Sequence, residues 1–535
     1  MKPLTKFVAR CLLGLAFFFH AAAASPQNSL PSDDTTLGSL KFTQAFTAIQ
    51  QNFAELIDPD QAIFDGGIRG MLSALDPFCA FFDQDQFELL KQQTRGEALG
   101  FGSILYVTPG KILVLQTAQG SPSWRAGLGP GDEIVEINGT RVNRIDFQSL
   151  VDLLRRSRSH PVRLGVIHPG RFVSQDFDLK PAEVALPSVD KSFLLSPGIG
   201  YLHLSGFERT TPQEVLDAVV KLSTPPLQGL VLDLRDNHGG VLEAAIGVAG
   251  LFLKPDALVL TMRGRSSPEK AYRTTSSQGP ELPSTLLRDG ERSRTVAPPR
   301  RFDMPVIVLV NGDTASAAEV LAAALQEHDR AVIAGESTYG KGVVQSVTPL
   351  SENTGLALTT AQYFTPSGRS IQRPLPGTGL AAPGRELDPA SSSSHFCTDD
   401  GRPLAPSGGI APDVQIPSRR LDPWVVFLNQ TGAFTNYASE YLELHGRANK
   451  SVEPDAAMLE DFKDFLRRGG VRTPEEYWDK DQGYLKLRIK VELINLVSGL
   501  ASGDEVDIKG DPQVQQAARL FPQIPQILKG SGTKK

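Results

Sequence analysis

Two nearly continuous apolar segments constrain the fold of this chain more than any other feature. They are Gly229-Leu-Val-Leu-Asp-Leu-Arg235 and Pro305-Val-Ile-Val-Leu-Val310. An apolar run without alternation is typical of a strand that is buried on both faces. Each run is followed by a turn that contains glycine and then by a helical pattern, over residues 241–253 and 316–326. The sequence therefore predicts an α/β core with a sheet that helices cover on both faces.

The first residues have the order of a secretory signal. Three basic residues precede the short apolar stretch 11–19, and Ala22-Ala23-Ala24 offers a cleavage site of small residues. The apolar stretch is too short for a comfortable transmembrane helix. We expect a signal peptide over residues 1–24 and an exported protein. It would be periplasmic after cleavage, or anchored to the membrane and facing the periplasm if the segment is retained.

Composition narrows the classes of function. The 535 residues suffice for roughly three or four domains. The net charge of −6 and the pI near 5.9 argue against nucleic-acid binding. The mature chain would hold only Cys79 and Cys397, which could pair or remain free thiols. No cluster of cysteine and histidine has metal-ligand spacing, so we expect neither a metal nor a cofactor.

Changes of pattern divide the chain after the signal. The expected regions are a disordered lead-in (25–39), an N-terminal helical region (40–96), a β-rich domain (97–182), the α/β core (183–420) and a C-terminal helical region (421–535). Two polar excursions interrupt the core, over residues 266–300 and 373–407. The second is rich in proline, glycine and serine, and we expect a surface loop there.

The β-rich domain contains an ordered set of glycine motifs. Gly100-Phe-Gly102, Gly120-Ser-Pro122, Ala126-Gly-Leu-Gly-Pro-Gly-Asp132 and Ile137-Asn-Gly139 resemble the PDZ domain of exported proteases. The resemblance implies a small β-barrel whose edge strand accepts a peptide by strand addition. Single glycines of this kind would be only turn residues, but the complete pattern favours peptide binding.

The resemblance also implies roles for individual residues of this domain. Gly100 and Gly102 would leave backbone N–H groups free to hold a peptide carboxylate. Phe101, Ile104 and Leu105 would shape the apolar pocket for the peptide.

The core offers a nucleophile and a base. Ser316 follows a buried strand and begins an alanine-rich helix, so its hydroxyl should lie at the carboxyl end of the sheet. A serine hydroxyl is a weak nucleophile that needs a neighbouring base. Lys341 can serve if burial lowers its pKa from about 10.4 to about 7–8. If residues 341–347 form a strand, Gln345 shares a face with the lysine and could orient its amine.

Backbone donors for an oxyanion are expected near the serine. The amide of Ala317, at the helix start, would be the first donor. Gly239 and Gly240 follow the other buried strand and could supply the second.

Other readings of these residues remain open. Ser316-Ala-Ala-Glu319 also fits a capping box, in which Glu319 reaches back to the helix start. Lys341 could be an ordinary solvated lysine. A Ser-His-Asp arrangement would have to use Asp233 and His238, with His238 in a glycine turn.

The full set of motifs, in order after the PDZ-like segment, resembles the C-terminal processing peptidases, also called tail-specific proteases. The motifs are Asp233-Leu-Arg-Asp-Asn-His-Gly-Gly240, Asn311-Gly-Asp-Thr-Ala-Ser-Ala-Ala-Glu319, Gly335-Glu-Ser-Thr-Tyr-Gly-Lys-Gly342 and Thr359-Thr-Ala-Gln-Tyr-Phe-Thr-Pro-Ser-Gly-Arg369. The resemblance covers residues 40–416. It implies a ClpP/crotonase-like core with Ser316 as nucleophile, Lys341 as general base and Gln345 as the residue that orients the lysine. His238 and Asp313 depart from the family pattern, which often has proline and glycine there.

We therefore expect an exported serine endopeptidase that binds unstructured protein C-termini through its PDZ domain. Its partners would be proteins or peptides with free C-termini; an adaptor or activator protein, membrane association and a homodimer are left open. A proteolytically dormant PDZ scaffold is the main alternative. A hydrolase of non-peptide esters is weaker because it leaves the PDZ segment without a purpose.

Overall fold

The computed structural model describes residues 17–18, 33–59, 61–94, 99–158, 160–184, 187–265, 268–274, 302–350, 353–380, 395–406, 408–446 and 453–529. The predicted signal segment lies outside these residues except for Phe17–Phe18. Within the described ranges, every helix is too short or too polar to cross a bilayer.

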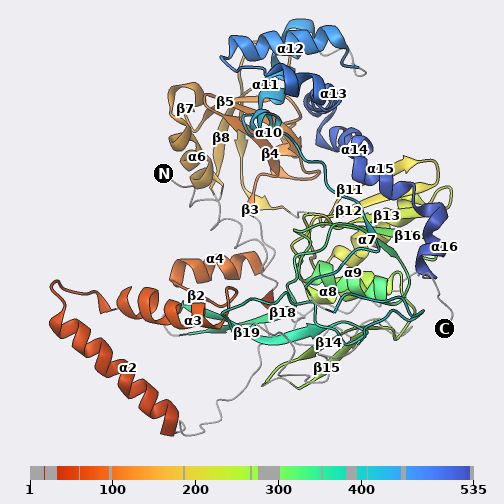
Figure 1. Cartoon of the computed structure of the whole chain (residues 1–535). Coiled ribbons are helices and arrows are strands. Elements are labelled where there is room, and N and C mark those ends of the chain that lie inside the picture. The colour runs from red at the N-terminus through yellow and green to blue at the C-terminus, as the bar shows by residue number, and fades with distance from the viewer. Residues whose placement is uncertain are drawn as a thin grey trace, which may run out of the picture.

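A six-stranded, mostly parallel sheet forms the α/β core (Figure 1). Its strands, in spatial order, are β11 (Val189–Ser196), β12 (Ile199–Leu204), β13 (Gly229–Asp233), β16 (Val306–Val310), β17 (Val332–Gly335) and β20 (Val414–Gln415). Only β11 runs antiparallel to its neighbour. The two apolar runs of the sequence are thus the adjacent central strands β13 and β16, as their composition predicts.

Helices cover both faces of this sheet. Three helices pack on one face: α7 (Thr211–Leu222), α8 (Leu242–Gly250) and α9 (Ala317–Glu327). Two C-terminal helices, α15 (Pro512–Ala518) and α16 (Ile524–Leu528), pack on the other. Along β13, Leu230 and Leu232 point into the first layer and Val231 into the second. Each such buried side chain contributes about 1.5–3 kcal/mol, which explains why both faces are apolar.

A second, antiparallel sheet lies beside the core. Its path is β18 (Val343–Pro349), β19 (Gly355–Phe364), β14 (Leu258–Arg263) and β15 (Lys270–Arg273). The N-terminal region adds β2 (Ala80–Phe82), which pairs antiparallel with β19. The strand β1 (Phe17–Phe18) runs parallel to β18. This sheet carries the segment that follows Lys341.

The N-terminal region is mostly helical: α2 (Asp33–Asn52), a π-helix (Gln61–Ile68), α3 (Arg69–Leu75) and α4 (Gln84–Thr94). One sequence prediction is wrong here and one element was missed. Residues 33–39 belong to the helix α2 rather than to a disordered lead-in. The strand β2 was not predicted, because three residues take this form only through their partner β19.

The PDZ domain is built from β4 (Ser103–Thr108), β5 (Lys111–Thr117), α5 (Pro122–Arg125), β6 (Glu133–Ile137), β7 (Thr140–Arg141), α6 (Phe147–Ser157), β8 (Val162–Ile167) and β9 (Gln175–Leu179). The sheet order is β4-β5-β6-β8-β9, with β7 on β6. The strands β3 (Leu99–Gly100) and β10 (Ala182–Glu183) pair antiparallel where the chain enters and leaves this domain. The predicted Asn138-Gly139 hairpin turn is confirmed, and both residues have positive φ.

The C-terminal helices reach from the PDZ domain to the core (Figure 1). They begin with α10 (Pro423–Gln430), α11 (Ala433–His445), α12 (Ala456–Arg468) and α13 (Glu475–Ser498) and continue through α14 (Leu500–Gly510) to α15 and α16. Tyr106 of β4 donates its hydroxyl to the Gly432 carbonyl (3.1 Å), and Leu113 of β5 lies in the apolar cluster of α10–α13. One continuous segment therefore contacts both the PDZ domain and the six-stranded core sheet.

Two smaller expectations are resolved. Cys79 and Cys397 are free thiols, so the structure holds no bridge between them. The described part of the segment 373–407 is not only surface loop, since the buried Arg402 pairs with Asp329 (2.7 Å) and Asp413 (2.5 Å). Ion pairs buried in this way anchor the segment to the core.

Candidate active site

Ser316 lies at the start of α9, at the carboxyl end of the central sheet, as the sequence predicts. The side chain is buried, and the backbone has φ 58° and ψ −121°. A residue other than glycine rarely adopts this conformation, which stores strain and is typical of nucleophile turns. Thr314 supports the turn: it accepts from the Asn311 N–H (3.0 Å) and donates to the Leu234 carbonyl (2.8 Å).

Glu319 ties the nucleophile segment to the lysine segment. Its Oε2 accepts from the backbone N–H groups of Ser316 (2.9 Å) and Lys341 (2.8 Å). Its Oε1 accepts from the Gly340 N–H (2.8 Å) and the Thr338 hydroxyl (2.5 Å). Burial raises the pKa of this carboxyl, and the four donated hydrogen bonds oppose that effect. The capping interaction predicted from sequence exists, but it is only one of four.

Lys341 is buried, with 6% of its surface exposed. Burial lowers the pKa of its amine to about 8, while the charges of Glu319 and Asp76 act in the opposite direction. Its Nζ lies 5.2 Å from the centre of the Phe78 ring. Asp76 and Phe78 come from the segment between α3 and β2, so the N-terminal region contributes to the environment of the lysine. The solvated-lysine alternative is thereby excluded.

Gln345 is buried on β18, and its Nε2 donates to Thr359 Oγ1 on β19 (3.4 Å). The strand begins at Val343 rather than at Lys341, and its pairing with β19 shifts register between Val344 and Gln345. A strand over residues 341–347, the condition on which lysine and glutamine would share one face, is therefore not formed as predicted. A role for Gln345 in orienting the lysine stays a prediction.

Of the three predicted oxyanion donors, two remain suitable. Ala317 is the first residue of α9, where an amide has no acceptor within its own helix. Within the described chain, the Gly240 N–H donates to no acceptor. The prediction that Gly239 is an oxyanion donor is corrected, because the Gly239 N–H already donates to Asn237 Oδ1 (2.9 Å). Its role is steric: a Cβ there would lie 2.8 Å from Ser316 Cβ.

The predicted peptide-binding residues lie at one end of the PDZ domain. Gly100 pairs with Ala182 in the β3–β10 ladder. Gly102 has φ 74°, and a Cβ there would approach Ser121 Cβ to 2.3 Å. Phe101 packs against the domain core, whereas Ile104 is 49% exposed on the edge strand β4. Ile104 is thus the apolar side chain of this set that solvent reaches most readily.

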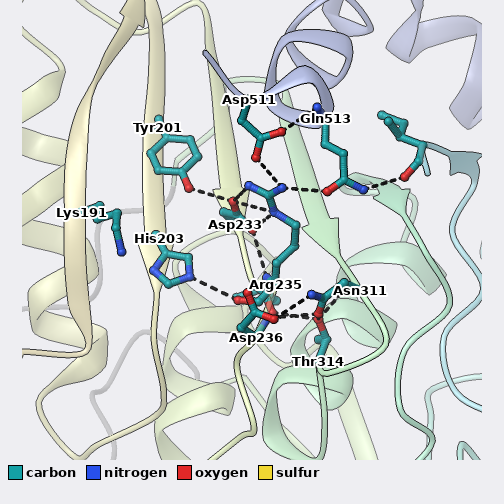
Figure 2. A network of polar contacts seen from close by, with 12 residues as sticks. Lys191, Tyr201, His203, Asp233, Arg235, Asp236, Asn311, Thr314, Asp511 and Gln513 are labelled. Atoms are coloured by element: carbon teal, nitrogen blue, oxygen red, sulfur yellow. Dashed lines mark hydrogen bonds and ion pairs between the residues drawn. The ribbon is translucent and has the colours of Figure 1, made fainter. Parts of the chain in front are cut away.

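A polar network that was not predicted surrounds Arg235, at the end of β13 (Figure 2). The buried Asp233 carboxylate accepts from the Tyr201 hydroxyl (2.7 Å) and from Nε and a terminal nitrogen of Arg235. These contacts occupy Asp233, and His238 is exposed. The Ser-His-Asp alternative therefore loses its acid. Asp233-Leu-Arg235 was visible in the sequence only as part of a motif.

No group of three or more histidine, cysteine, aspartate or glutamate side chains among the described residues is arranged to hold a metal ion.

Comparison with known proteins gives a consistent result. A model of peptidase family S41 matches residues 198–379, and a PDZ-domain model matches residues 113–167. The chain is 32% identical over 370 residues to a carboxy-terminal-processing protease of Bartonella bacilliformis, covering 68% of this chain and 79% of that protein. It is 30% identical over 396 residues to a chloroplastic C-terminal processing peptidase of Tetradesmus obliquus, covering 68% and 80%. A solved photosystem II D1 C-terminal processing protease is 27% identical, with a TM-score of 0.35 and coverage of 71% of this chain and 92% of that chain.

Proposed function

The chain belongs to the carboxy-terminal processing proteases of peptidase family S41, which are serine-type peptidases, and from this premise we propose a Ser-Lys endopeptidase mechanism. Ser316 is the nucleophile, Lys341 the general base and Gln345 the residue that orients the lysine. The observation that carries the proposal is the pair of buried residues Ser316 and Lys341, whose backbone amides share one carboxylate oxygen of Glu319.

The proposed reaction proceeds in two stages. Neutral Lys341 takes the Ser316 hydroxyl proton as the serine oxygen attacks the peptide carbonyl. The Ala317 and Gly240 amides donate to the resulting oxyanion. The lysine then gives its proton to the leaving amine, and an acyl-enzyme remains. A water molecule, deprotonated by the same lysine, attacks the ester and releases the peptide acid and the free serine.

The PDZ domain supplies the substrate in this proposal. An extended C-terminus adds to the edge strand β4, its carboxylate is held by the loop Gly100–Gly102, and its apolar last side chain lies near Phe101 and Ile104. The protein acts after export, in the periplasm or anchored on its membrane. The ClpP/crotonase-like description of the core belongs to the same proposal.

A homodimer is also part of the proposal. The helix α2 exposes Leu37, Leu40, Ile49 and the following Phe53, each by half or more of its surface. Ile49 and Phe53 are four residues apart and so lie on one side of the helix, and a second copy of the chain would cover them.

The test uses an unfolded protein that ends in apolar residues, such as β-casein, incubated with the purified protein and with Ser316→Ala. We expect fragments, detected by mass spectrometry, only with the unmutated serine. An alkyl fluorophosphonate then separates the alternatives, because it labels a working serine but not a dormant scaffold. Absence of both cleavage and labelling in the unmutated protein would establish the PDZ scaffold instead.

The pKa of Lys341 predicts the pH dependence of the reaction. Only the neutral amine can accept a proton, and burial lowers its pKa to about 8. Below that pH, kcat/KM should fall about tenfold per unit, and above it the rate should level off. A profile of kcat/KM between pH 6 and pH 10 measures this fall, which is the acid limb of the profile. The substrate is a short peptide that reports chemistry rather than binding. A plateau that extends down to pH 6 would contradict a lysine base.

A further inference from the structure

The C-terminal helical region reaches the catalytic core through Arg235. The N-terminal residue of α15 is Pro512, and Asp511 precedes it as the helix cap. Asp511 Oδ2 lies 2.7 Å from a terminal nitrogen of Arg235, and Gln513 Oε1 accepts from the same nitrogen at 2.8 Å. The other nitrogens of the guanidinium donate to Asp233. Arg235 is thus divided between the core strand and a helix that lies 276 positions further along the chain, as Figure 2 shows.

These contacts are largely buried. Only 13% of the Arg235 side chain, 24% of Asp511 and 1% of Asp233 are exposed. Gln513 is buried too, and its Nε2 donates to the Ile416 carbonyl (2.7 Å), so its oxygen is held toward the arginine. Charge-assisted hydrogen bonds in a buried, bidentate geometry fix the plane of a guanidinium. The orientation of Arg235 therefore depends on both the core and α15.

The backbone that follows Arg235 leads directly to the nucleophile. Asp236 has φ 59°, a left-handed conformation that needs external support. Asp236 exchanges two hydrogen bonds with Asn311. The Asn237 carbonyl accepts from the Ala315 N–H (2.9 Å), one residue before the catalytic serine. Gly240, the proposed oxyanion donor, follows Asn237 by three residues.

Resting on the proposed function, we infer that Asp511 and Gln513 are positioning residues for the reaction. They hold Arg235, and through it the strained turn 236–240, in the place that aligns the oxyanion amides with Ser316. Neither residue touches the reacting atoms. The C-terminal region is in this sense part of the catalytic apparatus, and because α10–α13 of the same region pack on the PDZ domain, it connects the two.

The decisive variant is Asp511→Asn. Asp511 Oδ1 caps α15 by accepting from the Gln513 N–H (2.7 Å), and asparagine serves that role as well. When the asparagine oxygen caps the helix, its NH₂ group replaces Oδ2 and faces the donor of Arg235. The variant therefore keeps the cap but turns an attraction into a repulsion. Asp455→Asn is the matched control, since Asp455 caps α12 through Met458 N (2.9 Å) and lies in the bundle beside the PDZ domain.

The experiment compares the purified protein with Asp511→Asn, Asp455→Asn and Ser316→Ala. The rate of labelling by a small alkyl fluorophosphonate and the kcat and KM for a fluorogenic peptide are measured, with a thermal melt of each variant. We expect Asp511→Asn to be labelled about tenfold more slowly and to lose about tenfold in kcat, with KM within about twofold. Asp455→Asn should match the unmutated protein.

Gln513→Leu provides a second variant, because it removes the other acceptor of Arg235 and leaves Asp511 in place. Its labelling rate should fall in the same direction. Unmutated labelling rates and kcat in folded Asp511→Asn and Gln513→Leu would overturn the inference, and would leave these residues as anchors of α15 only. If the unmutated protein itself is not labelled, the proposed peptidase function fails first and the inference fails with it.

Discussion

Replacing Lys341 by alanine should abolish peptide hydrolysis while the protein stays folded. The expected loss in kcat is about 10⁴-fold or more, the scale on which a general base matters to a serine nucleophile. Lys341 is buried beside Phe78, and no other cation in the described site has the same combination of burial and a pKa lowered to about 8. A neutral hydroxyl left without its base attacks a peptide carbonyl very slowly.

The measurement is kcat for a fluorogenic peptide across pH 7 to 10, with Lys341→Ala beside Ser316→Ala. Lys221→Ala, an exposed lysine on α7, is the matched control and should behave as the unmutated protein. Removing a buried amine also relieves its desolvation, so the thermal melt of Lys341→Ala should not fall much. Substantial activity in purified Lys341→Ala would rule out the dyad.

Much of the core could be predicted from sequence because its strands are apolar on both faces. β13 and β16 differ from the predicted runs by one or two residues, and α9 is displaced by one residue from the predicted helical pattern 316–326. Such elements follow from local patterns and from burial on both sides. The strand β2 could not be predicted, because its three residues depend on pairing with β19.

The residues of the site also divide into those that local sequence patterns predict and those that depend on distant contacts. Ser316 and Lys341 were identifiable because their flanking motifs are local, and the burial of the lysine agrees with its apolar neighbours. The capping contact of Glu319 was predicted, but its three contacts to residues 338–341 were not, because a capping-box pattern says nothing about a loop about 20 positions later in the chain. The bond from Arg235 to Asp511 is more distant still, and a single sequence carries no signal for it. The predicted strand over residues 341–347 was wrong in its start, because β18 begins two residues later, at Val343.

Glu319→Ala should cost both stability and activity, because it removes one acceptor from four donors at once. The donors are three backbone N–H groups and the Thr338 hydroxyl, all around a fully buried carboxylate. A buried donor left without an acceptor costs about 1–3 kcal/mol, and the neighbouring backbone can relax for only some of them. We expect a loss of about 3–5 kcal/mol in the free energy of unfolding, measured by denaturant titration.

Glu319→Gln is the sharper variant because it nearly preserves the shape of the side chain. Each carboxylate oxygen of Glu319 accepts two hydrogen bonds, so an amide must direct its NH₂ group at two donors in either orientation. The backbone amides of Ser316 and Lys341, or of Gly340, then lose their common acceptor. Because small misplacements of reacting groups reduce rates strongly, we expect kcat to fall about 100-fold.

The pH profile separates this role from a loss of stability. The charge of Glu319 raises the pKa of Lys341, so removal of that charge should lower the lysine pKa further. The acid limb of the residual activity should therefore move to lower pH in Glu319→Gln. The matched control is Glu492→Gln: Glu492 is also buried, but it pairs with Arg488 (2.5 Å) and accepts from Thr435 in the C-terminal bundle. That variant should lose stability without moving the limb, and an unmoved limb in Glu319→Gln would show that the carboxylate is neutral or electrostatically remote from the base.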